Sequence, residues 1–398
     1  MTSFNAIRIT EHVYWVGAID AELRDFHGYS TSYGTTYNAY LIIGDEPILI
    51  DTVKAPFYEE MLTRIASVLD PKKIKYIISN HAEMDHSGSL PKAIQLIKPQ
   101  RVFASCAGVD ALNAHFHDNF ALTTVSDAEE LSLGNARFKF FETRMLHWPD
   151  SMFTFYANDG VLFSQDAFGM HLATTKLFAT EHEQSLLRHE AAKYYANILL
   201  PYSSLVLKLL DKLPALNLNL KIIAPDHGPI WNREKEINWI VSCWRSWAEQ
   251  RKTDKIVIVY ATMWYSTMLM ATAIADGMAQ SQVEVKIMPM MGSHRSDVAT
   301  ELLEAKGLVV GSPTINQQVF PTIADVMCYL KGLKPQNLCG QVFGSYGWSG
   351  EALALLQKDL QSMRVKLISE AVKAKYVPTT NDLVNCHNLG VALAESIK

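Results

Sequence analysis

The stretch HAEMDHSG, residues 81–88, places two imidazoles and two carboxylates within six positions. These side chains bind metal ions once they are deprotonated. The stretch follows KIKYIISN, an apolar run typical of a strand, so the four groups lie where that strand ends. Four potential ligands so close together predict a metal site. They are His81, Glu83, Asp85 and His86.

Three further candidate ligands occupy the same kind of position later in the chain. His147 follows FKFFET, Asp166 ends GVLFSQD, and His227 follows LKIIAPD, each of which is typical of a strand. A single His or Asp at a strand end is usually a cap or turn residue, and we interpret the isolated histidines in that way. They are His27, His115, His117, His171, His182, His189 and His294.

The elements that position these residues differ between the two parts of the chain. Residues 1–250 contain many short strand-like runs and a few helical stretches, which predicts a sheet-rich α+β sandwich whose strand-end loops converge on one rim. The charged stretch EQRKTDK, residues 249–255, is the candidate linker. After it, β-branched runs alternate with helical stretches, which is typical of a doubly wound parallel sheet. We therefore predict domains at 1–250 and 254–398.

The second domain begins with a strand, a hydroxyl-rich loop and a helix, KIVIVYATMWYSTMLMATAIAD. Hydroxyls at a helix N-terminus favour a phosphate. The loop contains neither G-x-G-x-x-G nor G-K-[ST], so FMN is favoured over a dinucleotide or a nucleoside triphosphate. Two further glycine-containing loops, 311–320 and 343–352, follow later strands. The predicted FMN contacts are Thr262, Met263, Trp264, Tyr265, Ser266, Thr267, Pro313, Thr314, Asn316, Ser345, Tyr346, Gly347, Trp348, Ser349 and Gly350.

Composition excludes several other classes of protein. The net charge is −5 and Lys and Arg are scattered, so no nucleic-acid partner is expected. An uninterrupted apolar run of about 18 residues is absent, so no membrane association is expected. The 5 cysteines are widely spaced and form no C-x-x-C pair. This spacing argues against a disulfide framework, a thiolate zinc site and an iron–sulfur cluster, and it fits reduced thiols in a cytoplasmic protein.

The pattern H-x-[EH]-x-D-H, followed by distant His, Asp and His, resembles the metallo-β-lactamase superfamily. Most hydrolases of that superfamily have His at the second position, where this chain has Glu83. The resemblance implies one metal on His81, Glu83 and His147, another on Asp85 and His227, and Asp166 as the bridge. His86 is either a seventh ligand or turned away. Three carboxylates favour iron or manganese over zinc.

A metallo-β-lactamase-like αββα sandwich followed by a flavodoxin-like doubly wound parallel sheet resembles the flavodiiron proteins, also called A-type flavoproteins or rubredoxin:oxygen oxidoreductases. The resemblance includes DFHGY, GTTYNAYL, YYANI, PDHG, GSPT and GWSGE. It implies two non-haem irons and FMN, with reduction of O2 to water, of NO to N2O, or of both. It also implies Tyr194 near the diiron pocket and offers His27 as a second catalytic candidate, and its electron donors are rubredoxin or a reduced deazaflavin.

The resemblance further implies a head-to-tail homodimer. A 250-residue domain has a radius of gyration of roughly 18 Å, so the flavin and irons of one chain are expected to be far apart. Two-fold symmetry can place each FMN beside the irons of the partner. The competing hypotheses are a di-zinc hydrolase carrying a flavodoxin domain and an electron carrier with a degenerate metal pocket.

Overall fold

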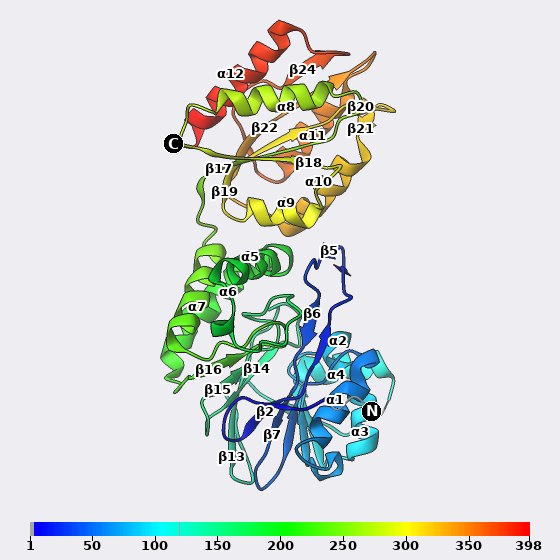
Figure 1. Ribbon diagram of the computed structural model, residues 1–398, viewed down its shortest axis with the longest axis vertical. Coiled ribbons are helices and arrows are strands. Elements are labelled where there is room, and N and C mark those ends of the chain that lie inside the picture. The colour runs from blue at the N-terminus through cyan, green and yellow to red at the C-terminus, as the bar shows by residue number, and fades with distance from the viewer. Residues whose placement is uncertain (1–3, 119) are drawn as a thin grey trace. The chain divides into compact units, whose positions relative to one another are not determined.

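The computed structural model describes residues 4–118 and 120–398, which form two compact units (Figure 1). The first contains the chain up to Phe26, Thr31–Tyr194 and Ser204–Arg245. The second contains His27–Ser30, Tyr195–Ser203 and Ser246–Lys398, so two short segments from the first half of the chain belong to it. Helix α7 (Glu234–Ala248) ends before the expected linker, whose last three residues already lie in β17 (Thr253–Tyr260). The domain limits 1–250 and 254–398 stay predictions.

The first unit contains two mixed sheets that face each other. One sheet has the strand order β1 (Ile7–Arg8), β2 (Val13–Trp15), β7 (Tyr40–Ile42), β8 (Ile48–Ile50), β9 (Tyr76–Ile78), β10 (Arg101–Ser105), β11 (Leu122–Val125). The other has the order β12 (Glu130–Leu133), β13 (Ala136–Glu142), β14 (Met152–Tyr156), β15 (Val161–Phe163), β16 (Ile222–Ala224). A short ribbon adds β3 (Ala18–Asp20) with β6 (Thr35–Tyr37). Strand β4 (Asp25–Phe26) pairs with β5 (Tyr29–Ser30), whose residues are grouped with the second unit.

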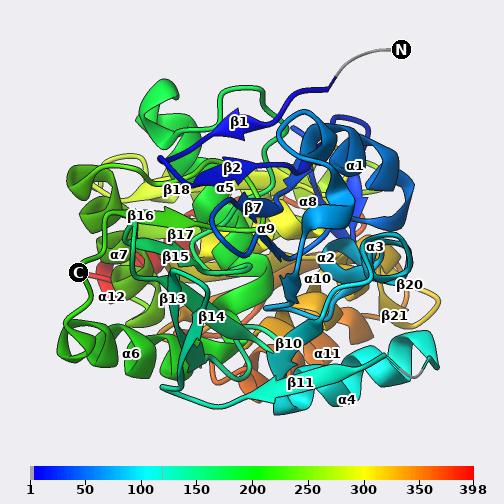
Figure 2. The ribbon, with the colours of Figure 1, turned by 90° about the horizontal axis from the view of Figure 1, so that it is seen from below.

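Helices cover the outer faces of both sheets, which gives the predicted αββα order (Figure 2). The first sheet carries α1 (Tyr58–Ala66), α3 (Leu90–Ile97) and α4 (Cys106–Phe116). On the side of the second sheet lie α5 (Gln184–Tyr194), α6 (Ser203–Lys212) and α7. Between the sheets, alternate strand positions supply a buried core that includes Trp15, Tyr40, Phe140 and Phe163. This burial fixes the strand register, and therefore fixes which residues emerge at the strand ends.

The candidate metal ligands leave these strands on short connections. His81 and Glu83 follow β9, His147 lies between β13 and β14, and Asp166 follows β15. The sequence predicts a loop up to a helix beginning at Ser87, but a short helix α2 (Met84–Ser87) already carries Asp85 and His86. Glu83 occupies the position before the first helical turn and its side chain makes no capping hydrogen bond there, so the helix begins three residues earlier than expected without a side-chain cap.

The second unit is a parallel sheet with the order β18 (Glu284–Pro289), β17, β19 (Ala305–Gly311), β22 (Cys339–Tyr346), β23 (Lys366–Leu367), with β24 (Val372–Lys375) also paired to β22. Helices α8 (Ser266–Gly277) and α12 (Thr380–Ser396) lie on one face, and α9 (Arg295–Leu302) and α10 (Pro321–Leu333) on the other (Figure 1). Helix α11 (Glu351–Ser362) follows β22, and β20 (Thr314–Ile315) pairs with β21 (Gln318–Val319). This order is that of flavodoxin, whose strand reversal places the ligand site at the carboxyl ends of the central strands.

None of the helices within the described residues is both long enough and apolar enough to cross a membrane.

Candidate functional site

The first metal cluster consists of His81, Glu83, His147 and Asp166. The Nε2 atom of His147 lies 3.2 Å from Oε2 of Glu83 and 3.0 Å from Oδ2 of Asp166. The Nε2 atom of His81 lies 3.3 Å and 3.2 Å from the same two oxygens. Ligands about 2.1 Å from one ion and at right angles to each other are roughly 3.0 Å apart. The four atoms therefore surround a position that fits one ion.

The second cluster consists of Asp85, His86 and His227, together with the other oxygen of Asp166. The Nε2 atom of His227 lies 3.2 Å from Oδ2 of Asp85. The Nε2 atom of His86 lies 3.3 Å from Oδ1 of Asp166 and 3.5 Å from Oδ1 of Asp85. The imidazole of His86, whose orientation the sequence left open, therefore points into this cluster.

The carboxylate of Asp166 is divided between the two clusters. Its Oδ2 faces His81 and His147, whereas its Oδ1 faces His86 and His227. Asp166 is 1 % exposed, and neither of its oxygens accepts a hydrogen bond of normal geometry. The same is true of both oxygens of Asp85 and both ring nitrogens of His86. Buried polar atoms are costly unless they are paired, and bound metal ions satisfy them. The donor set therefore fits two metal ions that share Asp166.

Outer groups fix the orientation of the imidazoles. The Nδ1 atom of His81 is 2.9 Å from Oδ2 of Asp150, which also accepts from the backbone N–H of Ala82 at 2.6 Å. The Nδ1 atom of His227 is 2.6 Å from the carbonyl oxygen of Thr36, to which it donates. Both rings consequently direct Nε2 to the metal positions, as metal-binding histidines commonly do. The sequence did not indicate this role for Asp150, although WPD places it only three residues after His147.

A buried polar and aromatic wall stands beside the second cluster. The Tyr194 ring lies 5.1 Å from that of His171, which is 4.7 Å from that of His227. Burial raises the pKa of Tyr194 well above its usual value, and the charge of Asp166 raises it further, so the phenol stays protonated. His171 is fully buried, although its sequence suggested only a turn residue. His27, the other catalytic candidate, is exposed, belongs to the second unit and is not in either cluster.

The charge state of Asp166 is set by opposing effects. Burial favours the neutral acid, but the neighbouring imidazoles of His86, His147 and His81 outweigh burial and hold the pKa of Asp166 well below its usual value. The carboxylate is therefore ionised and ready to bind cations.

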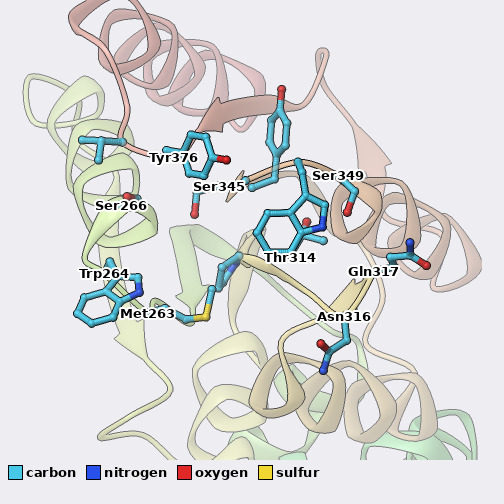
Figure 3. Close-up of a pocket in the computed structure, with 14 residues that line it drawn as sticks. Met263, Trp264, Ser266, Thr314, Asn316, Gln317, Ser345, Ser349 and Tyr376 are labelled. Atoms are coloured by element: carbon cyan, nitrogen blue, oxygen red, sulfur yellow. The ribbon is translucent and has the colours of Figure 1, made fainter.

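The second unit contains a cavity of about 770 Å³ at the carboxyl ends of β17, β19 and β22. In Figure 3, Met263 and Trp264 approach it from the first of these loops, Thr314 and Asn316 from the second, and Ser345 and Ser349 from the third. Its lining is Met263, Trp264, Ser266, Pro313, Thr314, Asn316, Gln317, Ser345, Tyr346, Gly347, Trp348, Ser349, Tyr376 and Val377.

Most of the predicted flavin contacts therefore line one cavity, but four do not: Thr262, Tyr265, Thr267 and Gly350. Thr267 is fully buried, and its hydroxyl is 3.1 Å from that of Ser345. Contact of these four residues with FMN stays a prediction. Gln317, Tyr376 and Val377 were missed. Tyr376 and Val377 follow β24, an edge strand whose register with β22 the sequence did not reveal.

The cavity has the features that FMN requires. Ser266 begins α8, so unpaired backbone N–H groups and the positive end of the helix dipole face the loop. The hydroxyl of Thr314, which lines the cavity, has no hydrogen-bond partner among the described residues, and the same holds for Thr262 on the loop between β17 and α8. Trp264 and Trp348 are 85 % and 87 % exposed, which leaves flat apolar surfaces for a ring system. The cavity and its hydroxyls thus fit a phosphate-bearing flavin.

The fold and the two sites define a class of protein, a flavoprotein in which a flavodoxin domain is joined to a dinuclear metal site on a metallo-β-lactamase-like fold. Residues 35–228 match the model of the ODP family beta lactamases, and residues 258–390 match that of the flavodoxins. The chain is 42% identical to the nitric oxide reductase of Moorella thermoacetica, over 98% of each chain.

Solved structures agree with this assignment. Rubredoxin oxygen:oxidoreductase from Desulfovibrio gigas superimposes with a TM-score of 0.97 at 40% identity, over 99% of this chain and 98% of that one. The flavodiiron protein from Giardia intestinalis gives a TM-score of 0.95 at 31% identity, over 99% and 97%. The chain belongs to the flavodiiron protein family. This confirms the predicted fold class and the predicted cofactors, FMN and two irons.

Replacing the shared carboxylate tests the arrangement of the two clusters. Asp166→Ala removes an oxygen from each metal position, so we expect loss of at least one iron per chain and a more than tenfold fall in activity. FMN should remain at one per chain, because the flavin cavity is built by other residues. Elemental analysis and flavin absorbance measure both quantities. Retention of two irons with full activity would show that Asp166 is not the bridge.

Replacing Asp150 tests the orientation of His81. Asp150→Asn keeps the size of the side chain but removes the negative charge that holds Nδ1, so we expect iron to be lost to a chelator roughly 10–100-fold faster. Asp159→Asn is the matched control, because Asp159 pairs with His12 at 2.9 Å and is not in either metal cluster. Equal iron loss in both variants would rule out the orienting role.

Proposed function

We propose that this chain is an oxidoreductase that reduces O2 to water, NO to N2O, or both. The observation that carries the proposal is the pair of carboxylate-rich clusters joined through Asp166, in a chain that also contains a flavin cavity. The names of the similar proteins from Moorella and Desulfovibrio support these two gases as substrates. When bound, the irons and FMN supply the redox chemistry and relay the electrons.

The residues of the chain determine how the gas is held and protonated. Each oxygen of Asp166 faces one cluster, so this carboxylate would hold two irons in neighbouring positions, and the irons would supply the reduction of the gas there. Glu83, Asp85 and Asp166 contribute negative charge, which stabilises the oxidised state of the metals. Reducing one O2 to two waters takes four electrons and four protons, and reducing two NO to N2O and water takes two of each. Tyr194 keeps a proton beside Asp166 and, we propose, donates a hydrogen bond to the bound gas.

The main alternative, a di-zinc hydrolase, is not favoured. Zinc sites in hydrolases rely on imidazole nitrogens, whereas Glu83 replaces a nitrogen ligand here. A hydrolase would also have no need for a flavin cavity in the same chain. Nothing in the site favours an electron carrier with a degenerate metal pocket either, because the predicted ligands converge within two clusters.

A rubredoxin-type protein is the proposed electron donor, on the strength of the Desulfovibrio protein's name. A reduced deazaflavin is the alternative small-molecule donor. The cytoplasmic location stays a prediction from the spacing of the cysteines.

Steady-state turnover tests the function and the choice of gas. Protein loaded with iron and FMN, given saturating reduced rubredoxin, should consume O2 or NO at a rate that falls more than tenfold without iron. An oxygen electrode and an NO electrode measure the two rates, and the zinc-loaded protein is the control. Turnover of neither gas, together with hydrolase activity in the zinc form, would overturn the proposal.

We propose in addition that the protein works as a head-to-tail homodimer. The FMN cavity is surrounded by exposed aromatic side chains, including Trp264, Trp348 and Tyr376. The side chain of His147 is 14 % exposed, so the first metal cluster also approaches the surface. Large exposed apolar groups are typical of surfaces that a partner covers. In such a dimer, the flavin of one copy would lie against the surface near His147 of the other copy. Electrons would then pass rapidly to the irons, with Trp148 and Glu83 near the flavin edge.

Subunit complementation tests this dimer. One variant, His81→Ala with Asp166→Ala, lacks metal, and the other, Ser266→Glu with Thr267→Glu, repels the FMN phosphate. Each parent should be inactive. Subunit exchange should restore activity, because each heterodimer contains one flavin facing one intact diiron site. Mass spectrometry verifies that the subunits have exchanged. If the exchanged mixture is still as inactive as the two parent variants, the head-to-tail arrangement is contradicted.

A further inference from the structure

Two short segments of the second unit adjoin residues of the metal pocket in sequence. The segment His27–Ser30 follows Phe26, whose ring lies 4.9 Å from that of His171 and 6.3 Å from that of His227. The segment Tyr195–Ser203 follows Tyr194. Contacts that fix these two segments therefore also restrict the backbone of Phe26 and Tyr194, which lie in the wall beside the second metal cluster.

The segment after Tyr194 has an unusual backbone. Helix α5 ends at Tyr194 and continues as a π-helical turn, Tyr195–Leu199. Such turns are rare, since the wider ring of i to i+5 hydrogen bonds is less favourable than an α-helical turn, and they are frequent at functional sites. Because a π-helical turn is intrinsically unfavourable, the turn that follows Tyr194 needs stabilising contacts from other residues.

Asn197 supplies those contacts from the middle of the turn. Its Nδ2 donates to the carbonyl oxygen of Ser296 at 3.2 Å and to Oγ1 of Thr300 at 3.3 Å, both on α9. Its Oδ1 accepts a hydrogen bond from the Tyr329 hydroxyl of α10 at 2.8 Å. Asn197 is 9 % exposed; its bond to Ser296 is buried, and its bonds to Thr300 and Tyr329 are partly buried. The side chain thus ties the π-helical turn to two helices.

The first turn of α9 also holds the other segment. Ser296 Oγ accepts from the backbone N–H of Ser30 at 3.2 Å and lies 2.9 Å from its hydroxyl. Arg295 Nε donates to the carbonyl oxygen of Gly28 at 3.0 Å. The approach is close, since a Cβ at Gly28 would lie 2.4 Å from Nη2 of Arg295. One helical turn, Arg295 and Ser296, therefore contacts both segments.

We propose that Asn197 is a positioning residue for gas reduction, which holds Tyr194 in the wall of the metal pocket by fixing the π-helical turn to α9. The inference rests on the proposed function for its kinetic consequence, but its structural consequence is independent of it. Asn197 is a member of neither metal cluster, and in this proposal its effect reaches the reaction through Tyr194.

The kinetic test compares Asn197→Ala with Tyr194→Phe and with the double variant. Displacement of a pocket residue slows turnover, so Asn197→Ala should lower kcat roughly five- to tenfold, with one FMN, two irons and the wild-type rate of flavin reduction. The double variant should be no slower than Tyr194→Phe alone. Losses that multiply, full activity in Asn197→Ala, or loss of iron or FMN in it would each overturn the positioning role.

A second readout does not depend on activity. Hydrogen exchange on the metal-free protein should be faster in residues 194–199 of Asn197→Ala, and unchanged in the control Asn388→Ala, whose side chain is exposed on α12. Asn197→Asp, which keeps the acceptor for Tyr329 but removes the donation to Ser296, should show the same change if the alanine variant does not fold. Unchanged exchange would overturn the inference, whereas absence of gas turnover in the wild type would overturn only the proposed function.

Discussion

The division of one buried carboxylate between two clusters is the constraint on which the rest of this structure depends. The two oxygens of Asp166 face opposite ways, and each is within 3.5 Å of two imidazole nitrogens. Without metal, this arrangement buries charged and polar groups that lack hydrogen bonds, and that is costly. With two cations the same groups become a matched set. The sandwich therefore has to hold its strand ends firmly, and its core between two sheets does so.

The two cofactor sites follow one structural rule. In both units, functional residues emerge at strand ends, where the backbone has left the sheet and side chains of several strands meet. The strands stay apolar and set the register, and the loops supply the chemistry. The two units differ in the chemistry supplied, since the first gathers carboxylate and imidazole ligands, whereas the second leaves a cavity with hydroxyls and exposed aromatic rings. Within the second unit, Asn197 holds the π-helical turn that follows Tyr194 in sequence, which is the basis of its proposed positioning role.

The sequence predicted the features that depend on local pattern. The spacing of His81, Glu83 and Asp85 after an apolar run indicated a metal site, and a hydroxyl-rich loop before a helix indicated a phosphate. Contacts that depend on distant pairing were not predictable. Tyr376 reaches the flavin cavity only through the pairing of β24 with β22. His171 resembles any turn histidine until the fold buries it against His227. The helix α2 was missed because ligand spacing alone does not distinguish a loop from a single helical turn.

The central claim is that two irons share Asp166, and anomalous X-ray scattering from crystals of the iron-loaded protein tests it most directly. The account predicts two iron peaks, one within coordinating distance of His81, Glu83, His147 and Oδ2 of Asp166, the other near Asp85, His86, His227 and Oδ1 of Asp166. Data collected on both sides of the iron absorption edge assign the metal, and data around the zinc edge provide the control. A single peak, or two peaks without the Asp166 carboxylate between them, would contradict the account.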